Sequence, residues 1–314
     1  MGILSSLITG IIQDSPSGFL QDATDSSSKG MDKTFFIGIC RHRLLTDGEG
    51  VTTLVGFSGC PLRCKYCINK LCWEETGIIS YTPAELYDII KKDLIYLIAT
   101  GGGITFGGGE PGLHSKFISE FRKICDERLH IYLETSLNIP LENLLELIPA
   151  VDSYIVDIKD VNNQIYLRYT GCNNRKAIRN LKYMVDNNLT ERLTIRVPLI
   201  PEYNTEQDVE NSIAELKALG ITKFDRFTYR ASDKKPKCPE EQNTSEEMNY
   251  GKAVCEVLKQ IRIEIAAANN IPYTPHLCHH KQCLMGTCSV CEKELFKIET
   301  QLNNKMLAGD KIII

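Results

Sequence analysis

The stretch G-C-P-L-R-C-K-Y-C-I-N, from Gly59 to Asn69, contains three cysteines within eight residues. Cys60, Cys64 and Cys67 are separated by three and then two residues. Structural zinc sites usually pair C-x-x-C knuckles with a fourth ligand, and no fourth ligand adjoins this run. Such close spacing suits an iron–sulfur cluster, which one loop can wrap with thiolates. Three thiolates leave one iron of a four-iron cluster open, so the stretch predicts a cluster that also binds an exogenous ligand.

The composition is that of an ordinary globular protein. The chain has 314 residues, of which 43% are hydrophobic and 24% charged, and this length can hold one large domain or two small ones. A net charge of −4 gives no electrostatic case for nucleic acid as the main partner. No apolar run approaches the roughly 20 residues that cross a bilayer, and no secretory signal is recognisable. We therefore expect a cytoplasmic protein without a membrane partner.

The thirteen cysteines are more than a packed core needs. In a reducing compartment they indicate metal ligation rather than disulfides. Cys125 and Cys255 lie inside helix-like patterns and are interpreted as small core residues. Cys172 and Cys238 could face the mouth of a barrel, although a packing role is the simpler interpretation for each.

The middle of the chain alternates between strand-like and helix-like segments. Repeated β-then-α units predict a parallel sheet with helices outside it, and six strands suit a partial (β/α)6 barrel. A doubly wound open sheet is the alternative. The expected strands cover 52–57, 103–106, 130–134, 153–159, 193–198 and 224–229, and the expected helices cover 83–99, 115–127, 141–148, 174–186 and 206–219.

Three regions are predicted along the chain. Residues 1–33 form an N-terminal appendage and linker, residues 34–243 form the partial barrel, and residues 244–314 form a helical extension with a cysteine-rich metal site. Within the extension we expect helices over 245–269 and 290–306.

The cysteine triplet carries a family resemblance. C-x-x-x-C-x-x-C with Tyr66 before the last cysteine resembles the signature of the radical S-adenosylmethionine (SAM) superfamily. The surrounding segment from Thr46 to Asn69, T-D-G-E-G-V-T-T-L-V-G-F-S-G-C-P-L-R-C-K-Y-C-I-N, is similar to the glycyl-radical-enzyme activating enzymes of the pyruvate formate-lyase activating type. The resemblance covers about residues 36–230.

The resemblance implies both cofactors and chemistry. A 4Fe–4S cluster on Cys60, Cys64 and Cys67 would bind the amino and carboxylate groups of S-adenosylmethionine at its open iron. An electron, from a flavodoxin- or ferredoxin-type donor, would then cleave the sulfonium to give methionine and a 5′-deoxyadenosyl radical. In this family the radical removes a hydrogen atom from a polypeptide. The cofactors supply the chemistry, and the protein supplies position and shielding.

The glycine-rich run G-G-I-T-F-G-G-G-E-P, from Gly102 to Pro111, is the second matching motif. Without G-K-[ST] it is not a typical phosphate loop, but glycines let a backbone approach a ligand closely. By the resemblance, Gly108, Gly109 and Glu110 bind the amino group of S-adenosylmethionine.

Three further motifs end predicted strands. In the family, L-E-T-S and V-D-I-K belong to the layer that binds the ligand carboxylate and a monovalent cation, which assigns Glu134, Thr135, Asp157 and Lys159. The third motif, R-V-P-L-I-P-E-Y-N, begins at Arg196, which would reach the ligand's ribose or carboxylate through a charge-assisted contact.

The adenine contact is the least defined part of the expected site. Tyr66 and nearby backbone groups are the candidates. The segment F-T-Y-R-A, residues 227–231, departs from the family, which has a histidine near the adenine there.

The cysteine-rich tail has no counterpart in the simple activating enzymes. It contains Cys278, Cys283, Cys288 and Cys291, and three histidines lie nearby at 276, 279 and 280. Four cysteines at these gaps predict a second 4Fe–4S cluster, with one structural zinc as the alternative.

Two enzymatic functions follow. The first is activation of a glycyl-radical enzyme by abstraction of a hydrogen atom from a backbone glycine. The alternative is a peptide- or protein-modifying maturase that uses the tail for an auxiliary cluster. A non-catalytic metal-binding module is disfavoured by the ordered set at Cys60, Gly109, Asp157 and Arg196.

Overall fold

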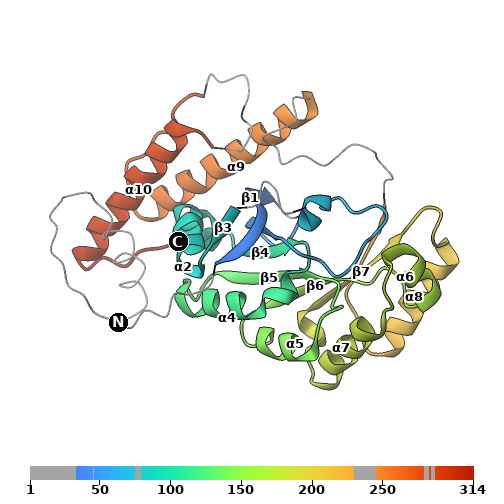
Figure 1. Cartoon of the computed structure of the whole chain (residues 1–314). Coiled ribbons are helices and arrows are strands. Elements are labelled where there is room, and N and C mark those ends of the chain that lie inside the picture. Colours follow the sequence, from blue (N-terminus) through green and yellow to red (C-terminus); the bar gives the residue numbers. More distant parts are fainter. Residues whose placement is uncertain (1–32, 45, 75–78, 230–244, 279–282, 284–286) are drawn as a thin grey trace.

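A computed structural model describes residues 33–44, 46–74, 79–229, 245–278, 283 and 287–314. It shows an α/β architecture built on one eight-stranded sheet in the order β3-β1-β2-β4-β5-β6-β7-β8 (Figure 1). All six predicted strands are present and parallel, and helices connect them. They are β2 (Val51–Phe57), β4 (Gly103–Gly108), β5 (His130–Thr135), β6 (Ser153–Asp157), β7 (Leu193–Leu199) and β8 (Phe224–Thr228).

Two antiparallel strands extend the sheet beyond these six units. They are β1 (Thr34–Leu44), which pairs with β2, and the short β3 (Ile79–Tyr81). β1 was not expected from the sequence. Its second half, I-C-R-H-R-L, interleaves charged and apolar residues, and most of its side chains are only partly buried, so the alternation of a half-buried strand is blurred.

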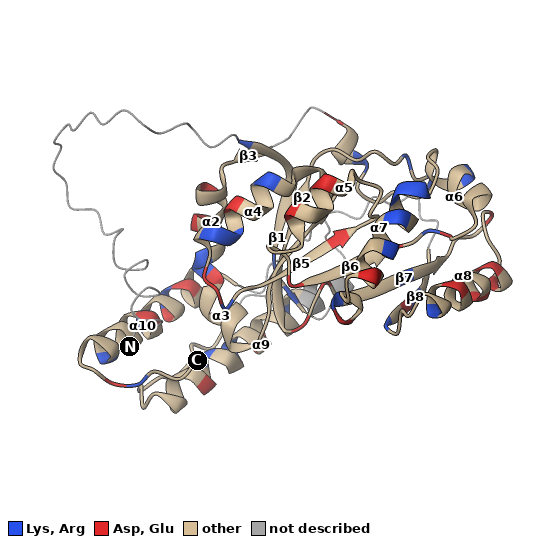
Figure 2. Ribbon diagram, turned by 90° about the horizontal axis from the view of Figure 1, so that it is seen from below, with Lys and Arg blue, Asp and Glu red and all other residues tan. Residues whose placement is uncertain are grey.

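The helices follow the predicted order and lie outside the sheet. They are α4 (Ser115–Ile124), α5 (Leu141–Leu147), α6 (Asn163–Thr170), α7 (Arg175–Asp186) and α8 (Glu206–Ala218), with α6 not foreseen. Gly220, just beyond α8, has a φ of +95°, which suits the predicted glycine stop. Figure 2 shows mainly basic residues along α7 and mainly acidic ones along α8.

The helix predicted over 83–99 is interrupted. The structure has α2 (Pro83–Ile90), a 3-10 turn (Lys91–Asp93) and α3 (Leu94–Ala99). Thr82 caps α2 with a capping box to Glu85, as expected for Thr-Pro at a helix start. At the interruption, the buried carboxylate of Asp93 accepts hydrogen bonds from Arg41 and shares another with His42 of β1. The tertiary contact explains the break.

The C-terminal extension consists of α9 (Ser245–Ala268) and α10 (Ser289–Leu307). They contact each other, and α9 also contacts α3 and β1 (Figure 1). Within the ranges given above, no helix is long and apolar enough to cross a membrane. The predicted appendage over 1–33, except its last residue, lies outside the described residues, as do Cys238, His279 and His280.

Candidate active site

The predicted site residues collect at one edge of the sheet. The cysteine loop follows β2, the glycine-rich turn ends β4, and Glu134, Asp157 and Arg196 lie at or near the ends of β5, β6 and β7. The carboxyl ends of parallel strands meet on one side of a sheet, which is where such folds bind ligands. Motifs that are far apart in the sequence therefore lie next to one another at this edge of the sheet.

Backbone hydrogen bonds fix the cysteine loop. The amide of Arg63 donates to Thr170 O at 2.8 Å, and that of Lys65 donates to Tyr169 O at 3.2 Å. Both acceptors lie at the end of α6. The thiol of Cys172, in the next turn, donates to Pro61 O at 3.3 Å. Cys172 therefore supports the base of the loop.

A fourth cysteine, not foreseen from the sequence, lies beside the triplet. Cys72 is 3% exposed, and its thiol lies near those of Cys60 and Cys67, where it can stabilise either thiolate by hydrogen bonding. These bonds lower the pKa of Cys60 and bring the pKa of Cys67 to about 6. The pKa of Cys72 is raised for the same reason. The available signal was its position only five residues after Cys67.

Cys64 has a different environment. Burial raises the pKa of its thiol to about 12, while the nearby charge of Lys159 acts in the opposite direction. Cys64 therefore neighbours the Asp157–Lys159 pair. This places the triplet next to the predicted ligand-carboxylate site.

The donor set at this loop suits an iron–sulfur cluster. Three thiols on one loop, with that of Cys72 beside them, are the kind of ligand that such clusters prefer. In the described part of the chain, no three Cys, His, Asp or Glu side chains are placed closely enough to hold a metal ion as they stand. Binding would therefore draw the thiols together, since metal binding and local ordering are coupled.

The glycine-rich turn touches the cysteine loop through its backbone. The amide of Gly109 donates to Phe57 O at 2.9 Å, and a Cβ on Gly109 would lie 2.1 Å from Gly59 O. Gly108 has a φ of +90°, which glycine adopts without strain. The carbonyl of Gly108 accepts a hydrogen bond from the side-chain Nδ2 of Asn69 at 2.8 Å. Side chains at these two positions would separate the two motifs.

Glu110 is buried and its carboxylate is already in use. It accepts hydrogen bonds from Thr135 Oγ1 at 2.6 Å, from Gly112 N at 3.1 Å, and from Ser136 N and Oγ at 2.9 and 2.5 Å. A carboxylate has about four acceptor positions. Burial raises the pKa of Glu110, whereas these hydrogen bonds act to lower it. The structure thus gives Glu110 and Thr135 a role in joining the ends of β4 and β5.

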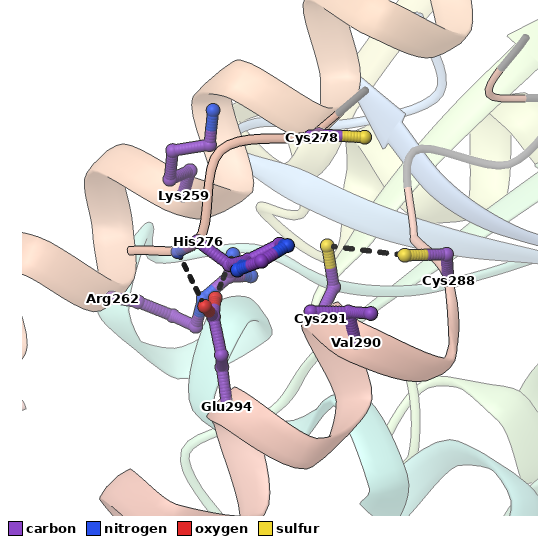
Figure 3. A pocket seen from close by; sticks show the side chains of 8 residues that line it. All are labelled: Lys259, Arg262, His276, Cys278, Cys288, Val290, Cys291 and Glu294. Atoms are coloured by element: carbon purple, nitrogen blue, oxygen red, sulfur yellow. Dashed lines mark hydrogen bonds and ion pairs between the residues drawn. The ribbon is translucent and has the colours of Figure 1, made fainter. Parts of the chain in front are cut away.

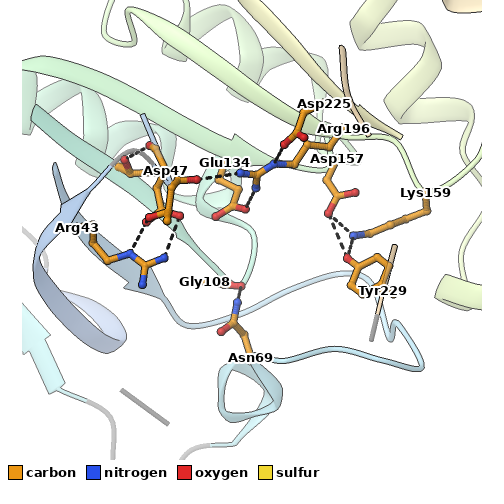
Figure 4. A network of polar contacts seen from close by, with 12 residues as sticks. Arg43, Asp47, Asn69, Gly108, Glu134, Asp157, Lys159, Arg196, Asp225 and Tyr229 are labelled. Atoms are coloured by element: carbon orange, nitrogen blue, oxygen red, sulfur yellow. Dashed lines mark hydrogen bonds and ion pairs between the residues drawn. The ribbon is translucent and has the colours of Figure 1, made fainter. Parts of the chain in front are cut away.

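Asp157 and Lys159 form an ion pair that Tyr229 completes (Figure 4). Lys159 Nζ also donates to Tyr229 Oη at 2.5 Å. Burial acts to lower the pKa of Lys159, but the charge of Asp157 helps to hold it well above its usual value. Asp157 Oδ1 is buried and has no hydrogen-bond partner among the described residues. A buried acceptor of this kind usually has a donor, and a bound ligand or cation could supply one.

Arg196 is held between two carboxylates (Figure 4). Its guanidinium donates to Glu134 and, at 3.0 Å, to Asp225 Oδ2. Burial raises the pKa of Glu134, and the charge of Arg196 partly offsets this effect. The sequence analysis assigned Glu134 and Arg196 but missed Asp225, because a single Asp in a half-exposed strand carries no motif.

Tyr66 belongs to a group of tyrosines. Its ring lies edge-on to Tyr169 and Tyr203, with ring centroids 6.1 and 5.7 Å apart. The ring of Tyr229 lies 6.1 Å from that of Tyr169. Tyr229 lies in the segment for which no adenine contact could be assigned. The contact with Tyr169 therefore brings this segment next to the group of tyrosine rings.

The tail cysteines come together with a residue from a different element. Cys283 and Cys291 form one buried cluster with Cys255 of α9, and Cys288 packs against it. Cys278 is exposed, and His276 lines a neighbouring cavity. Cys255 is buried as predicted, but among cysteines rather than among aliphatic side chains.

Comparison with known proteins decides the family. The model of the radical SAM superfamily matches residues 54–216, which include the cysteine triplet, the glycine-rich turn and the ends of β5 to β7. The chain belongs to the radical SAM superfamily. The superfamily implies a 4Fe–4S cluster and S-adenosylmethionine, and the thiols described above fit the cluster.

Relatives within the radical SAM superfamily narrow the kind of enzyme. The chain is 30% identical over 207 residues to the pyruvate formate-lyase-activating enzyme of Clostridium pasteurianum, covering 60% of this chain and 86% of the relative. It is 27% identical over 172 residues to the pyruvate formate-lyase 1-activating enzyme of Escherichia coli, covering 54% and 69%. The 4-hydroxyphenylacetate decarboxylase activating enzyme of Clostridium scatologenes is 26% identical, covering 58% and 80%. The chain is therefore an enzyme of the glycyl-radical-enzyme activating kind.

Solved structures of the superfamily are more distant. A domain of a pyruvate-formate lyase-activating enzyme from Bacteroides vulgatus is 22% identical, with a TM-score of 0.37, covering 51% of this chain and 94% of that domain. Coproporphyrinogen III oxidase from Escherichia coli is 15% identical, with a TM-score of 0.43, and the chain spans 53% of its length.

Proposed function

We propose that this radical SAM enzyme reductively cleaves S-adenosylmethionine and uses the product radical to abstract a hydrogen atom from a polypeptide backbone, activating a glycyl-radical enzyme. The observation that carries the proposal is the gathering of the cysteine loop, the Gly108–Gly109 turn, the Asp157–Lys159 pair and Arg196 at one edge of the sheet. The activating-enzyme relatives support the choice of a polypeptide substrate.

Each residue takes a role that its environment supports. Cys60, Cys64 and Cys67 hold the cluster, which when bound supplies the electron that cleaves the sulfonium. The backbone of Gly108 and Gly109 meets the ligand amino group, while Glu110 and Thr135 fix that turn.

The charged side chains at the strand ends bind the other groups of S-adenosylmethionine. Lys159 and the unpartnered Oδ1 of Asp157 face its carboxylate region, where a monovalent cation could also bind. Arg196, oriented by Glu134, reaches the ribose or carboxylate. Tyr66, with the neighbouring tyrosine rings, contacts the adenine.

Cleavage of S-adenosylmethionine and transfer of the hydrogen atom together require one electron from outside the protein. The electron enters from a flavodoxin- or ferredoxin-type donor, methionine leaves, and the new C–H bond of 5′-deoxyadenosine forms as the glycine Cα–H bond breaks homolytically. Arg63, Lys65 and Lys70 are exposed on the cysteine loop, and a basic surface here would favour docking of an acidic electron carrier.

A second candidate is favoured by the gathered cysteines of the extension. A peptide- or protein-modifying maturase would use a metal there, and we propose that the tail cysteines bind either a second 4Fe–4S cluster or zinc. We also propose three regions along the chain: an appendage and linker over 1–33, a partial barrel over 34–243 and a helical extension over 244–314.

Cleavage of S-adenosylmethionine tests the shared chemistry. Anaerobically reconstituted and reduced protein should release 5′-deoxyadenosine and methionine, and Cys64→Ala should abolish this because one iron loses its ligand. Normal cleavage by Cys64→Ala would contradict the cluster assignment.

Deuterium transfer then separates the two functions. A candidate polypeptide deuterated at glycine Cα should pass its label to 5′-deoxyadenosine if the enzyme is an activase. Transfer from a deuterated side chain alone would favour the maturase.

A further inference from the structure

Four partly or fully buried cysteines meet in the extension, and one comes from outside the cysteine-rich tail. Cys255, in the first half of α9, is 4% exposed and contacts Cys283 and Cys291, which are 8% and 6% exposed. The Sγ atoms of Cys288 and Cys291 lie 3.8 Å apart. The four thiols therefore form one group.

This group differs from ordinary core cysteines. A core cysteine normally packs among aliphatic and aromatic side chains, but this cluster consists of cysteines alone and is separate from the main core. No described cysteine is in a disulfide, and 3.8 Å is far longer than the roughly 2.05 Å of an S–S bond. Metal ligation accounts for so many adjacent thiols.

A cavity beside the thiols indicates the size of the ligand. It has a volume of about 290 Å³, and two of the four thiols, those of Cys288 and Cys291, line it together with Cys278, His276 and Glu294 (Figure 3). One water occupies about 30 Å³ of liquid, and a zinc ion with thiolates at about 2.3 Å needs no larger space. Four irons and four sulfides fill such a cavity better than one ion does.

The surroundings of the cavity also suit an anionic cluster. Arg262 is 1% exposed and lines the cavity together with Lys259. Arg262 is held by Tyr96 Oη at 2.7 Å and by Glu294 at 3.2 Å. Several thiolates in one buried site repel each other, and nearby cations reduce the cost of burying their charge. Arg262 and Lys259 are such cations, although they also pair with Glu294 and Glu256.

We propose that Cys255, Cys283, Cys288 and Cys291 bind a second 4Fe–4S cluster, with Cys255 supplied by α9. The exposed Cys278 stays outside the ligand set. This inference rests on the metal site proposed above for the tail, with Cys255 in place of Cys278 as the fourth ligand. Because no three such side chains in the described residues are close enough to hold an ion as they stand, binding draws the thiols inward.

The test uses the full chain with Cys60, Cys64 and Cys67 all changed to Ala, so that only the tail site can hold iron. After anaerobic reconstitution this variant should retain about four irons and four sulfides per chain and give a cluster electron paramagnetic resonance signal on reduction. Adding Cys255→Ala should remove both. Adding Cys278→Ala should leave both in place, as should the control Cys125→Ala, which removes a thiol from the main core region.

Three results would overturn the inference. They are zinc without iron in the triple variant, iron retained after Cys255→Ala, and iron lost after Cys278→Ala. Circular dichroism verifies folding, and Cys255→Ser provides a second variant of nearly the same volume; a folded Ser variant that keeps the iron counts against Cys255 as a ligand.

The outcome is independent of the reaction at the barrel. If the unaltered chain fails to cleave S-adenosylmethionine while the triple variant still holds four irons, the proposed reaction fails and this inference stands. If the unaltered chain cleaves S-adenosylmethionine and the triple variant holds no iron, the proposed reaction stands and this inference fails.

Discussion

At the cysteine loop, the thiol of Cys72 can form hydrogen bonds with the thiolates of two of the three predicted cluster ligands. Hydrogen bonds to cluster sulfurs tune the reduction potential, and they stabilise the more negative, reduced state. Cys72→Ala should therefore keep the four irons of this site and shift its potential to more negative values. A redox titration followed by electron paramagnetic resonance measures the shift.

The same variant tests whether the open iron is truly open. Complete loss of iron from the barrel site in Cys72→Ala, compared with Cys125→Ala as control, would mean that Cys72 is a fourth protein ligand. S-adenosylmethionine would then have to displace it.

Asp157 is the second residue whose environment makes a sharp prediction. Its side chain and that of Lys159 are 18% and 8% exposed, and removing one member of a buried pair leaves a charge uncompensated. Asp157→Ala should lower the free energy of unfolding by about 3–5 kcal/mol and weaken binding of S-adenosylmethionine. Urea unfolding and equilibrium dialysis measure the two effects.

Asp225→Ala is the matched control for stability. Asp225 also pairs with a cation, Arg196, but is 47% exposed, so its loss should cost about 0–1 kcal/mol. Equal losses for the two variants would show that the Asp157–Lys159 pair is solvated.

Among the structural elements, the turn after β4 depends most on its backbone. Gly109→Ala places a methyl group 2.1 Å from Gly59 O, and that oxygen belongs to the backbone before Cys60. We expect the cysteine loop to move away and the barrel site to lose most of its iron. Iron analysis and thermal unfolding check this prediction.

Gly38→Ala provides the control within the same sheet. A Cβ at Gly38, in β1, meets nothing within 4 Å, so iron loading should be unchanged. If both variants load iron equally, close backbone approach at Gly109 is not required.

Local signals were sufficient for most elements. The caps at Thr82 and Gly220 and the apolar runs of the six parallel strands were readable, because helix starts, helix stops and buried parallel strands depend on neighbouring residues. β1 and the break at Asp93 were not readable. Asp93 interrupts its helix because Arg41 and His42, about fifty residues earlier, bind its carboxylate.

At the scale of the whole molecule, α10 is attached to the barrel near Asp93. Burial raises the pKa of Glu299 in α10 to about 7, and the charge of Asp93 adds to this effect. As the pH rises, the unfolded chain releases the proton of Glu299 at about pH 4.3, the usual pKa of Glu. The folded protein keeps the proton until about pH 7. Protonation of Glu299 therefore adds to the free energy of unfolding. This contribution is complete below about pH 4 and is lost as the pH rises through about 7.

Glu299→Gln should remove this pH dependence. Between about pH 5 and pH 8 the wild-type protein should lose on the order of 3 kcal/mol more than the variant, as measured by urea unfolding. Glu292→Gln, at a glutamate that is 55% exposed on the same helix, should follow the wild-type curve. Parallel curves for all three proteins would contradict the effect of Glu299.

The sequence by itself determined the family chemistry and the order of the six parallel strands. The triplet at Cys60, the glycine run before Glu110 and the charged ends at Asp157 and Arg196 all lie at strand ends, and parallel strands must bring those ends to one edge. Local order along the chain was therefore enough to assemble the expected site.

The tertiary structure alone decided which other side chains join it. Cys72 turns back to the triplet, Tyr229 completes the Asp157–Lys159 pair, and Cys255 meets Cys283 and Cys291 across two helices. The spacing of single Cys or Tyr residues along the sequence does not reveal such contacts, because packing between distant elements sets them.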